Sequence, residues 1–363
     1  MKVGIEARAL HSGTTAGVKT YVRELTAALL ALGGAEYEVF DDDPPAWKLW
    51  WWINVQLPRK AKRSNIDVMH YTKAAVPPDF ARGKQVVVTI HDVIPIMFPG
   101  SQTLARRLYW PRALKNAAKR SDHIITVSEA SKRGIVEEFQ VDPEKVTVTA
   151  LGVRTEEFRY DPLTPVPSPR LGRGEPYLLF VGTRDKRKNV PLLIRAFARI
   201  EHEIPHRLVI AGRPALKQDE DKRQARELGL TDRVTCLDFV PESDLPALYA
   251  GADAFVYPSV YEGFGLPPLE AMAAGTPVIV SDGGALPEVV GTAGEIVPFS
   301  EDDSRARTRD DEFEKALADR ILQVLEDETR QETMRAAGLE RVKEFTWQGC
   351  AEKTFEVYKN LAA

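Results

Sequence analysis

The chain has 363 residues, which at about 150 residues per domain favours two domains. Its 44% hydrophobic and 28% charged residues are typical of a globular protein and exclude a disordered, collagen-like or coiled-coil chain. Lys and Arg total 49 against 53 Asp and Glu, so the net charge of −4 creates no overall basic field for nucleic acid. Cys236 and Cys350 match no metal-ligand spacing, which suits a reducing compartment.

No secretory signal pattern is visible, because Met1 leads directly into a strand-like segment. The most apolar stretch, residues 86–98, is interrupted by His91, Asp92 and Pro95. It is well short of the ~20 residues that a membrane-spanning helix needs. We therefore expect a cytoplasmic protein without a membrane span.

In the first half of the chain, short apolar runs alternate with longer segments of helical periodicity. The pattern predicts strands at 2–8, 36–40, 66–71, 86–90 and 124–127 and helices at 18–32, 103–119 and 129–139. Strands that alternate with helices favour a parallel sheet covered on both faces. Residues 86–90 form an unalternated β-branched run, which is typical of a central strand buried on both sides.

A change in composition separates this half from the next. Residues 161–176 are rich in proline and glycine and poor in apolar residues, so we expect a linker there. Strands are then predicted at 177–181, 207–211, 234–239, 254–257 and 277–281, and helices at 190–200, 219–228, 243–250, 267–274 and 312–326. The charged stretch 300–311 is interpreted as a solvated loop. The fold class is thus α/β, with parallel-sheet domains at 1–160 and 177–345.

The most informative segment is residues 257–278. It reads as a strand end, a glycine-flanked loop, a helix that starts near Pro267, a glycine stop and another strand. The glycines allow close backbone approach, and a helix N-terminus offers N–H groups to a phosphate. Glu262 in the loop and Glu270 on the helix can meet different parts of one ligand, since carboxylates accept hydrogen bonds from the vicinal hydroxyls of a ribose or hexose.

This segment closely resembles the Glu-x7-Glu signature of glycosyltransferase family 4, retaining enzymes of the GT-B fold. Further segments resemble family motifs: 181–183 with 187–189, 281–291, 294–297, 89–92, 127–132, 151–153 with Phe158, and 345–347. The resemblance implies two Rossmann-like domains facing a cleft, the first binding the acceptor and the second the nucleotide-sugar donor. It also implies that the last helix, 346–361, packs back on the first domain.

The resemblance also implies roles for individual residues. Lys188 matches the family lysine that contacts the donor diphosphate, where a positive charge stabilises the departing nucleoside diphosphate. Glu270 matches the glutamate that binds the ribose, Glu262 the one that faces the donor sugar, and His91 a histidine near the transferred sugar. The expected catalytic residues are His91, Lys188 and Glu262, and the expected donor-binding residues are Gly17, Gly182, Arg187, Lys188, Gly263, Phe264, Gly265, Leu266 and Glu270.

One family feature is displaced. The usual Gly-Arg pair of the family reads Gly182-Thr183 in this sequence. Either Arg184 or Arg187 is expected to take the place of the missing arginine. The displacement keeps open a non-catalytic sugar-nucleotide-binding paralogue as an alternative function.

The reaction that the resemblance implies is front-face transfer, in which the leaving phosphate helps to deprotonate the acceptor hydroxyl. No protein nucleophile is then required, so Glu262 is not given the nucleophile role that paired carboxylates suggest in glycosidases. We expect neither a cofactor nor a metal, because Lys188, helix dipoles and amides supply positive charge and no strand-end Asp-x-Asp is present.

A tryptophan-rich segment suggests a membrane partner. Trp47, Trp50, Trp51 and Trp52 precede a basic run at 59–63. Aromatic and basic side chains together suit a bilayer interface, which predicts peripheral contact with the inner face of the plasma membrane. The alternative is a helix that packs these aromatics inward or lines the acceptor cleft.

The functional prediction is transfer of a hexose from a nucleotide-sugar to a glycan or lipid-linked acceptor in polysaccharide assembly. The form of residues 187–189 and the 57–58 segment before 67–70 resemble mannosyltransferase-type members, so GDP-mannose is the first donor expected, with a UDP-hexose as the other. A GT-B nucleotide-sugar epimerase or a pyridoxal-phosphate-dependent phosphorylase are alternatives of other reaction types, which the Glu262 and Glu270 segment disfavours.

Overall fold

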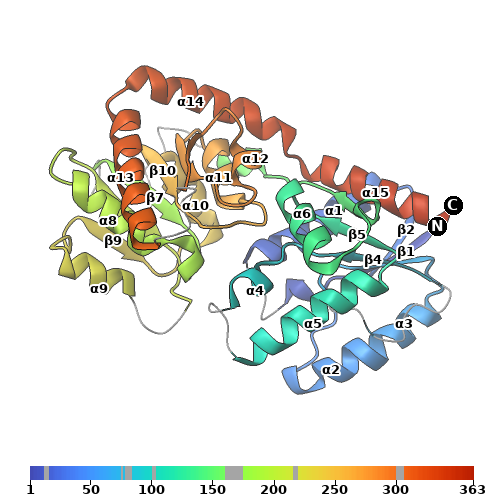
Figure 1. Cartoon of the computed structure of the whole chain (residues 1–363). Helices are drawn as coiled ribbons and strands as arrows, with labels where there is room; N and C mark the ends of the chain where they lie inside the picture. The colour runs from blue at the N-terminus through green and yellow to red at the C-terminus, as the bar shows by residue number, and fades with distance from the viewer. Residues whose placement is uncertain are drawn as a thin grey trace. The chain divides into compact units, whose positions relative to one another are not determined.

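The computed structural model describes residues 1–11, 16–74, 77, 84–99, 104–159, 175–215, 220–299 and 306–363. These residues group into two compact units, Met1–Gly152 with Phe345–Ala363, and Val153–Glu344 (Figure 1). The predicted linker lies almost entirely outside the described residues. The second unit already includes helix α7 (Thr155–Phe158), which the sequence analysis placed in the first domain.

The first unit is built on a parallel sheet, described with six strands in the order β2-β1-β3-β4-β5-β6. The strands are β1 (Lys2–Glu6), β2 (Glu36–Phe40), β3 (Val68–Tyr71), β4 (Gln85–Thr89), β5 (His123–Thr126) and β6 (Val146–Val148). The helices are α1 (Ala16–Leu32), α2 (Leu49–Trp51), α3 (Leu57–Arg63), α4 (Ile94–Met97), α5 (Leu104–Arg120), α6 (Glu129–Phe139) and α15 (Trp347–Ala362). Strand β4 lies between β3 and β5, the interior position that its β-branched run predicts.

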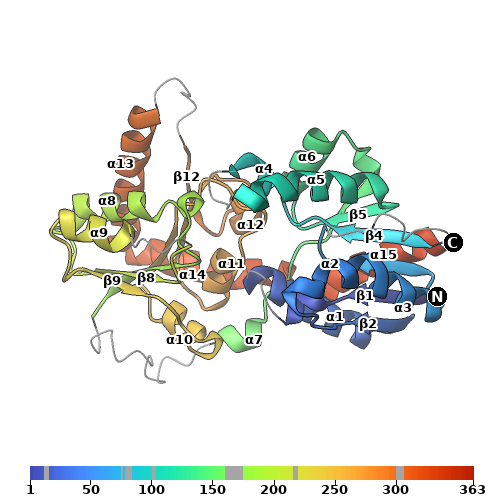
Figure 2. The same cartoon turned by 90° about the horizontal axis from the view of Figure 1, so that it is seen from below.

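Helices cover both faces of this sheet. In Figure 2, α5 and α6 lie on one face and α1 and α15 on the other. Ser128 begins α6 by accepting a hydrogen bond from the Ser131 backbone N–H, and Thr346 begins α15 by accepting one from Gly349. Residues 345–363 thus belong to the same compact unit as the N-terminal sheet.

A buried chain of polar side chains connects α15 to the sheet. His70 on β3 is hydrogen-bonded through Nδ1 to the Tyr358 hydroxyl at 2.6 Å and through Nε2 to the Thr89 hydroxyl at 2.7 Å. The Thr89 hydroxyl is also 2.8 Å from that of Tyr21 on α1. All four side chains are buried, so these bonds satisfy polar groups that would otherwise be costly to bury.

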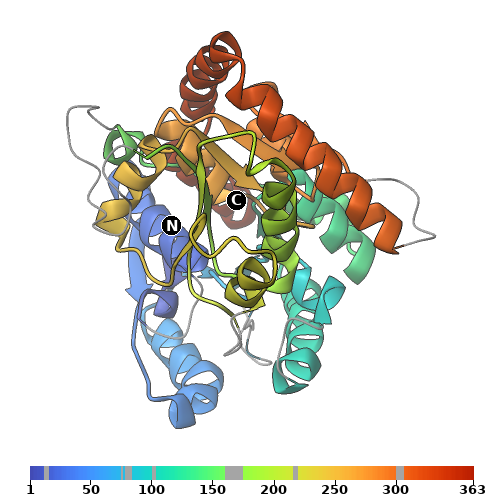
Figure 3. The same cartoon turned by 90° about the vertical axis from the view of Figure 1, so that its left-hand side faces the viewer.

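The second unit repeats the architecture with a parallel sheet described in the order β12-β11-β10-β7-β8-β9. The strands are β7 (Tyr177–Val181), β8 (Arg207–Ala211), β9 (Val234–Leu237), β10 (Ala254–Tyr257), β11 (Val278–Ser281) and β12 (Glu295–Val297). Besides α7, the helices are α8 (Val190–Ile200), α9 (Glu220–Glu227), α10 (Leu245–Ala250), α11 (Leu266–Ala273), α12 (Leu286–Val290), α13 (Ala306–Leu325) and α14 (Glu328–Arg341). Helix α13 packs along α8 (Figure 3), whereas α14 packs against α11.

The predicted α/β class with two parallel-sheet units is confirmed, and two details are corrected. Helix α13 begins at Ala306, so residues 306–311 are helical and only 300–305, which are not described, remain of the predicted loop. Trp52 is 1% exposed and packs in the core with α5 and α6, so it is not available to a membrane. The sequence analysis also missed β6 and α14.

Candidate functional site

The loop after β7 carries the predicted donor-phosphate residues. The Asp185 carboxylate accepts hydrogen bonds from the backbone N–H groups of Arg187 and Lys188, at 3.0 and 3.2 Å. This cap fixes a short 3-10 turn over Lys186–Lys188, which Asn189 ends with a φ of 57°. Arg187 and Lys188 are thereby held on a defined turn at the carboxyl end of a central strand, where ligands of such sheets bind.

Glycine is required where the loops after β7 and β8 meet. The two loops approach so closely that a Cβ on Gly212 would lie 2.0 Å from the Gly182 carbonyl oxygen. Gly212 also has a φ of 136°, a conformation that residues with a Cβ rarely adopt. The predicted donor residue Gly182 therefore sits in a backbone arrangement that only glycine at position 212 allows.

Lys188, Arg187 and Glu262 form one buried ionic cluster. The Glu262 Oε1 atom lies 2.6 Å from Lys188 Nζ and 2.7 Å from Arg187 Nη1. Lys188 Nζ also donates to the Tyr257 hydroxyl, and Arg187 donates to the Tyr261 carbonyl. Residues from two loops, more than 70 positions apart, are thus in direct contact. The sequence analysis assigned them separate roles at the donor site and did not predict this ionic cluster.

Backbone contacts fix the loop that carries Glu262. The Val260 N–H donates to the Arg187 carbonyl at 2.8 Å, and the Ala285 N–H donates to the Glu262 carbonyl at 2.9 Å. A Cβ on Gly284 would lie 2.4 Å from the Glu262 carbonyl oxygen, so the glycine at that turn is needed for the approach. The position of the carboxylate is therefore set by main-chain contacts on both sides.

The charges of the cluster are mutually stabilised against burial. Burial acts to raise the pKa of Glu262, but the nearby Lys188 and Arg187 outweigh it and the pKa is lowered. Burial lowers the pKa of Lys188, although Glu262 opposes that shift. The pKa of Arg187 is raised, because Glu262 and Asp185 outweigh the effect of burial. At neutral pH the site therefore presents a carboxylate bound to a guanidinium and to the Lys188 side chain.

Glu270 lies in a different environment from Glu262. It is half-buried on α11, and its Oε2 atom accepts a hydrogen bond from the Tyr249 hydroxyl at 2.8 Å. Its pKa is raised, mainly by burial and partly by the nearby Glu242, while Tyr249 and Arg154 act in the opposite direction. The structure therefore separates the two glutamates of the motif into an ion-paired one and a hydrogen-bonded one.

The loop before α11 presents backbone groups rather than charged side chains. Gly265 precedes the helix with a φ of 126°, which favours glycine. Pro267 and Pro268 lie in the first turn and have no N–H to donate. The backbone N–H groups of this loop therefore belong to residues 263–266, the predicted donor-binding set.

Arg184 and Arg187 have different partners. The Arg184 side chain is 1% exposed and binds Asp238 at 2.8 Å, Asp221 at 3.3 Å and the Gly212 carbonyl at 2.9 Å. Arg184 therefore stabilises the loop after β7 through these buried contacts. Arg187 instead contributes its guanidinium to the cluster with Glu262.

The remaining predicted residues lie in the first unit. His91 directly follows β4 and Ile90, and its Nε2 lies 3.2 Å from the Thr72 carbonyl while its ring packs edge-on against Tyr21. Burial lowers the pKa of His91 to about 4, so the imidazole is neutral at pH 7. Gly17 is exposed in the first turn of α1.

The sequence analysis missed three side chains that contact the predicted residues. They are Tyr257, Tyr249 and Asp185, which bind Lys188, Glu270 and the Lys186–Lys188 turn. A signal existed for Tyr257, the last residue of β10 at the start of the informative segment, and for Asp185, a capping residue type before the basic turn. Tyr249 is on α10, and only tertiary packing brings it to Glu270.

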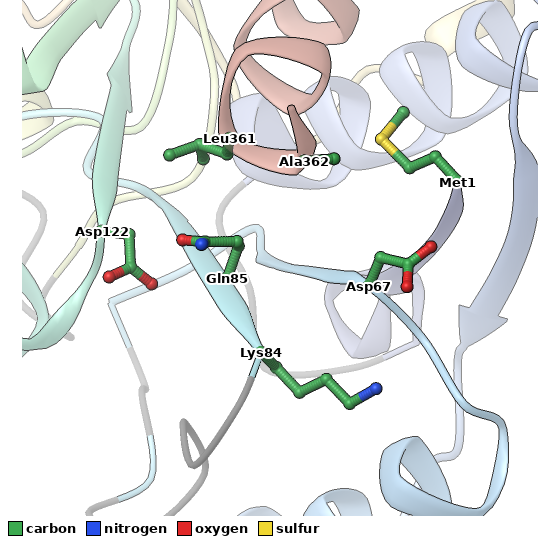
Figure 4. Close-up of a pocket in the computed structure, with 7 residues that line it drawn as sticks. All are labelled: Met1, Asp67, Lys84, Gln85, Asp122, Leu361 and Ala362. Atoms are coloured by element: carbon green, nitrogen blue, oxygen red, sulfur yellow. The ribbon is translucent and has the colours of Figure 1, made fainter.

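A cavity of about 620 Å³ lies elsewhere in the first unit (Figure 4). Its lining includes Asp67, Lys84, Gln85 and Asp122 around the amino end of β4. The Asp67 and Asp122 carboxylates already accept hydrogen bonds from the backbone N–H groups of Lys2 and Val86. Because ligands of parallel sheets bind at the opposite, carboxyl ends of strands, we do not assign the donor to this cavity.

Among the described residues, no group of three or more His, Cys, Asp and Glu side chains is placed to hold a metal ion. Among the helices whose residues are described, none has the length and apolar character needed to cross a membrane.

Comparison with known proteins identifies relatives of both halves. Residues 167–341 match the family model described as Glycosyl transferases group 1, and residues 35–157 match the model of Glycosyltransferase Family 4. The O-antigen chain mannosyltransferase B of Escherichia coli is 33% identical over 285 residues, which cover 77% of this chain and 71% of the relative. The MMP alpha-(1->4)-mannosyltransferase of Mycolicibacterium hassiacum is 31% identical over 326 residues, covering 83% and 72%.

The fold is also that of solved glycosyltransferase structures. Anabaena Alr3699/HepE in complex with UDP and glucose matches with a TM-score of 0.75 at 21% identity, over 99% of this chain and 100% of that chain. This likeness shows the fold, GT-B, which has two parallel-sheet units. Sequence relatives, fold and motif agree, and the chain belongs to glycosyltransferase family 4.

Proposed function

We propose that the chain is a retaining glycosyltransferase that moves a hexose, with mannose favoured, from a nucleotide-sugar to a glycan or lipid-linked acceptor. The observation that supports this most is the buried cluster of Lys188, Arg187 and Glu262 in the same unit as Glu270. Mannose is favoured because the relatives of 33% and 31% identity carry the name mannosyltransferase. GDP-mannose is therefore the first donor to test.

In this proposal the second unit binds the donor. Lys188 and Arg187 bind the diphosphate, and their positive charge stabilises the leaving nucleoside diphosphate as negative charge develops on it. Glu270 accepts hydrogen bonds from the ribose hydroxyls, and the backbone N–H groups of residues 263–266 contact the sugar and phosphate. Glu262 would release its two cations to the diphosphate and face the donor sugar.

The first unit would bind the acceptor. His91 is neutral and half-buried, in contact with Thr72 and Tyr21, so it is suited to a hydrogen bond with the transferred sugar rather than to an ionic contact. Gly17, at the start of α1, would allow the backbone to approach the donor phosphate. In front-face transfer the leaving phosphate takes the acceptor proton, so no protein nucleophile and no metal are required.

Calorimetric titration with UDP, GDP and ADP tests the donor site. We expect micromolar binding of one nucleotide, weakened at least tenfold, or about 1.4 kcal/mol, in Lys188→Ala and in Glu270→Ala. Lys186→Ala is the matched control, because Lys186 lies on the same turn but is exposed. Parent-like binding by both site variants would contradict the donor-site assignment.

Turnover with the nucleotide-sugar separates the transferase from its alternatives. Release of the nucleotide together with a new glycosidic bond of unchanged anomeric configuration would support retention. Binding without turnover on any acceptor would favour the sugar-nucleotide-binding paralogue, and epimerised sugar without transfer would favour the epimerase.

We also propose a peripheral membrane contact through the aromatic segment of the first unit. Trp47, Trp50 and Trp51 are 78%, 72% and 45% exposed, and Lys48 lies over the Trp47 ring at 4.6 Å. Exposed tryptophans beside basic side chains favour an anionic bilayer surface. This placement also argues against the inward-packing alternative, except for Trp52.

Vesicle sedimentation tests this contact. We expect the protein to sediment with vesicles that contain phosphatidylglycerol, and the triple variant Trp47→Ala, Trp50→Ala, Trp51→Ala to remain in solution. Phe239→Ala removes a comparably exposed aromatic of the second unit and serves as the control. Equal sedimentation of parent and triple variant would overturn the proposal.

A further inference from the structure

The surroundings of Lys188 account for two of its three N–H donors. One donates to Glu262 Oε1 at 2.6 Å and one to the Tyr257 hydroxyl. An ammonium has three donors and no acceptor, so among the described residues one donor of Lys188 remains for a ligand. If Glu262 turns toward the donor sugar, the Tyr257 contact is the side-chain hydrogen bond that still orients the ammonium.

The ring of Tyr257 contributes a second interaction. Lys188 Nζ lies 4.6 Å from the ring centroid, within the range of a cation–π contact. The hydroxyl oxygen and the ring therefore both stabilise the charged form of Lys188 without supplying a negative charge. A neutral partner of this kind does not compete with a diphosphate for the lysine by charge.

The position of Tyr257 is set by aromatic packing. Its ring stacks on Phe180 of β7 at 5.4 Å and on Phe255 of β10 at 5.6 Å between centroids. Phe255 in turn packs against Tyr249, whose hydroxyl binds Glu270. One packed row of aromatic side chains thus carries both tyrosines that contact the donor-site charges.

We propose that Tyr257 is a positioning residue, which holds the Lys188 ammonium toward the donor diphosphate while Glu262 serves the sugar. The inference rests on the proposed function, because it names the residue that makes the catalytic lysine effective. Tyr257 itself does not touch the reacting atoms in this scheme and acts through Lys188.

Tyr257→Phe is the sharpest variant, because it removes the hydroxyl and keeps the stacked ring. We expect kcat/KM for transfer to fall about tenfold. Loss of the hydroxyl also removes an acceptor for the charged amine, so the pKa of Lys188 falls and the alkaline limb of the pH profile moves to lower pH. Tyr257→Leu, which also removes the cation–π contact, is expected to shift the limb further.

Two controls distinguish positioning from a general structural effect. Tyr177→Phe removes a buried hydroxyl of the same sheet that donates to the Leu248 carbonyl at 2.7 Å, so it should leave the alkaline limb in place. In a Lys188→Ala background, Tyr257→Phe should cause no further loss, because the residue through which it acts is absent. A full additional loss in that background, or an unmoved limb in both Tyr257 variants, would overturn the proposal.

Binding of inorganic pyrophosphate, followed by calorimetry from pH 7 to 10, separates this inference from the proposed function. If the parent binds pyrophosphate but transfers no sugar, the transferase proposal fails, and the pH dependence of binding still tests Tyr257. Binding that weakens at lower pH in Tyr257→Phe than in the parent supports the inference. Identical pH dependence, or absence of binding to the parent, contradicts it.

Discussion

The two units each bury a polar network, and the two networks differ in charge. In the first unit, Tyr358, His70, Thr89 and Tyr21 form a chain of neutral groups, since burial lowers the pKa of His70 to about 3. In the second unit, the network around Glu262 keeps a carboxylate against two basic side chains. The networks also occupy different positions in their sheets. His70 lies within strand β3, whereas Glu262 lies in the loop that follows β10.

The difference separates a structural network from a functional one. A fully paired neutral chain stabilises one arrangement of α1 and α15 on the sheet at a small desolvation cost. Burying charges costs several kcal/mol per ion, which the mutual attraction must offset. A cluster of perturbed charges at the carboxyl end of a sheet is therefore better explained by a ligand than by stability.

The largest loss of stability is expected from Glu262→Ala. It leaves Lys188 and Arg187 buried without their shared carboxylate, which costs about 3–5 kcal/mol by the usual penalty for breaking a buried pair. All six tryptophans lie in the first unit, so their fluorescence should report a first-unit transition that is unchanged. Scanning calorimetry should show the loss in the second unit's transition, and an unshifted calorimetric transition would show that the pair is not a stabilising one.

Acid should weaken the first unit through His70. Its pKa is about 3 in the native state and about 6.5 when unfolded, so the unfolded chain binds the proton first as pH falls. The contribution of neutral His70 to the free energy of unfolding is therefore complete above pH 6.5 and is lost as the pH falls toward 3. The loss amounts to about 2 kcal/mol at pH 5. Denaturation followed by tryptophan fluorescence at pH 7 and pH 5 should show a smaller pH effect in His70→Gln. An equal change in stability between pH 7 and pH 5 in the parent and in His70→Gln would contradict the role of His70.

Tyr358→Phe should cost about 1–3 kcal/mol, because it leaves the buried His70 Nδ1 without its partner. Hydrogen exchange should rise first in α15 and the facing α1. Tyr37→Phe is a suitable control, since the Tyr37 hydroxyl donates a long 3.4 Å hydrogen bond to the Gly33 carbonyl at a partly exposed position. Protection of α15 equal to that of the parent would show that apolar packing alone holds this helix.

The smallest effect is expected from metal removal. If Lys188 and Arg187 supply the positive field at the diphosphate, an excess of EDTA should leave the transfer rate within about twofold of the untreated enzyme. Restoration by Mg²⁺ or Mn²⁺ of an activity that EDTA abolishes would contradict metal independence. Arg187→Gln should lower activity under both conditions, since its charge remains missing whatever metal is present.

Much of the fold followed from local pattern. The β-branched run at 86–90 predicts an interior strand, and β4 occupies that position. Hydrophobic periodicity is a property of neighbouring residues, so it survives into the folded unit. The sequence pattern did not predict elements that are short or highly charged, such as β6 and the first turn of α13, because they contain few apolar residues.

The sequence by itself determined the α/β class, the two sheets and the family, because each depends on local pattern or on a motif of fixed spacing. The tertiary structure decided which arginine joins Glu262, since Arg184 is bound by aspartates from distant segments. The tertiary structure also buries Trp52 and brings the Tyr257 ring into contact with Lys188. These outcomes depend on side chains from other elements, and no local pattern encodes such neighbours.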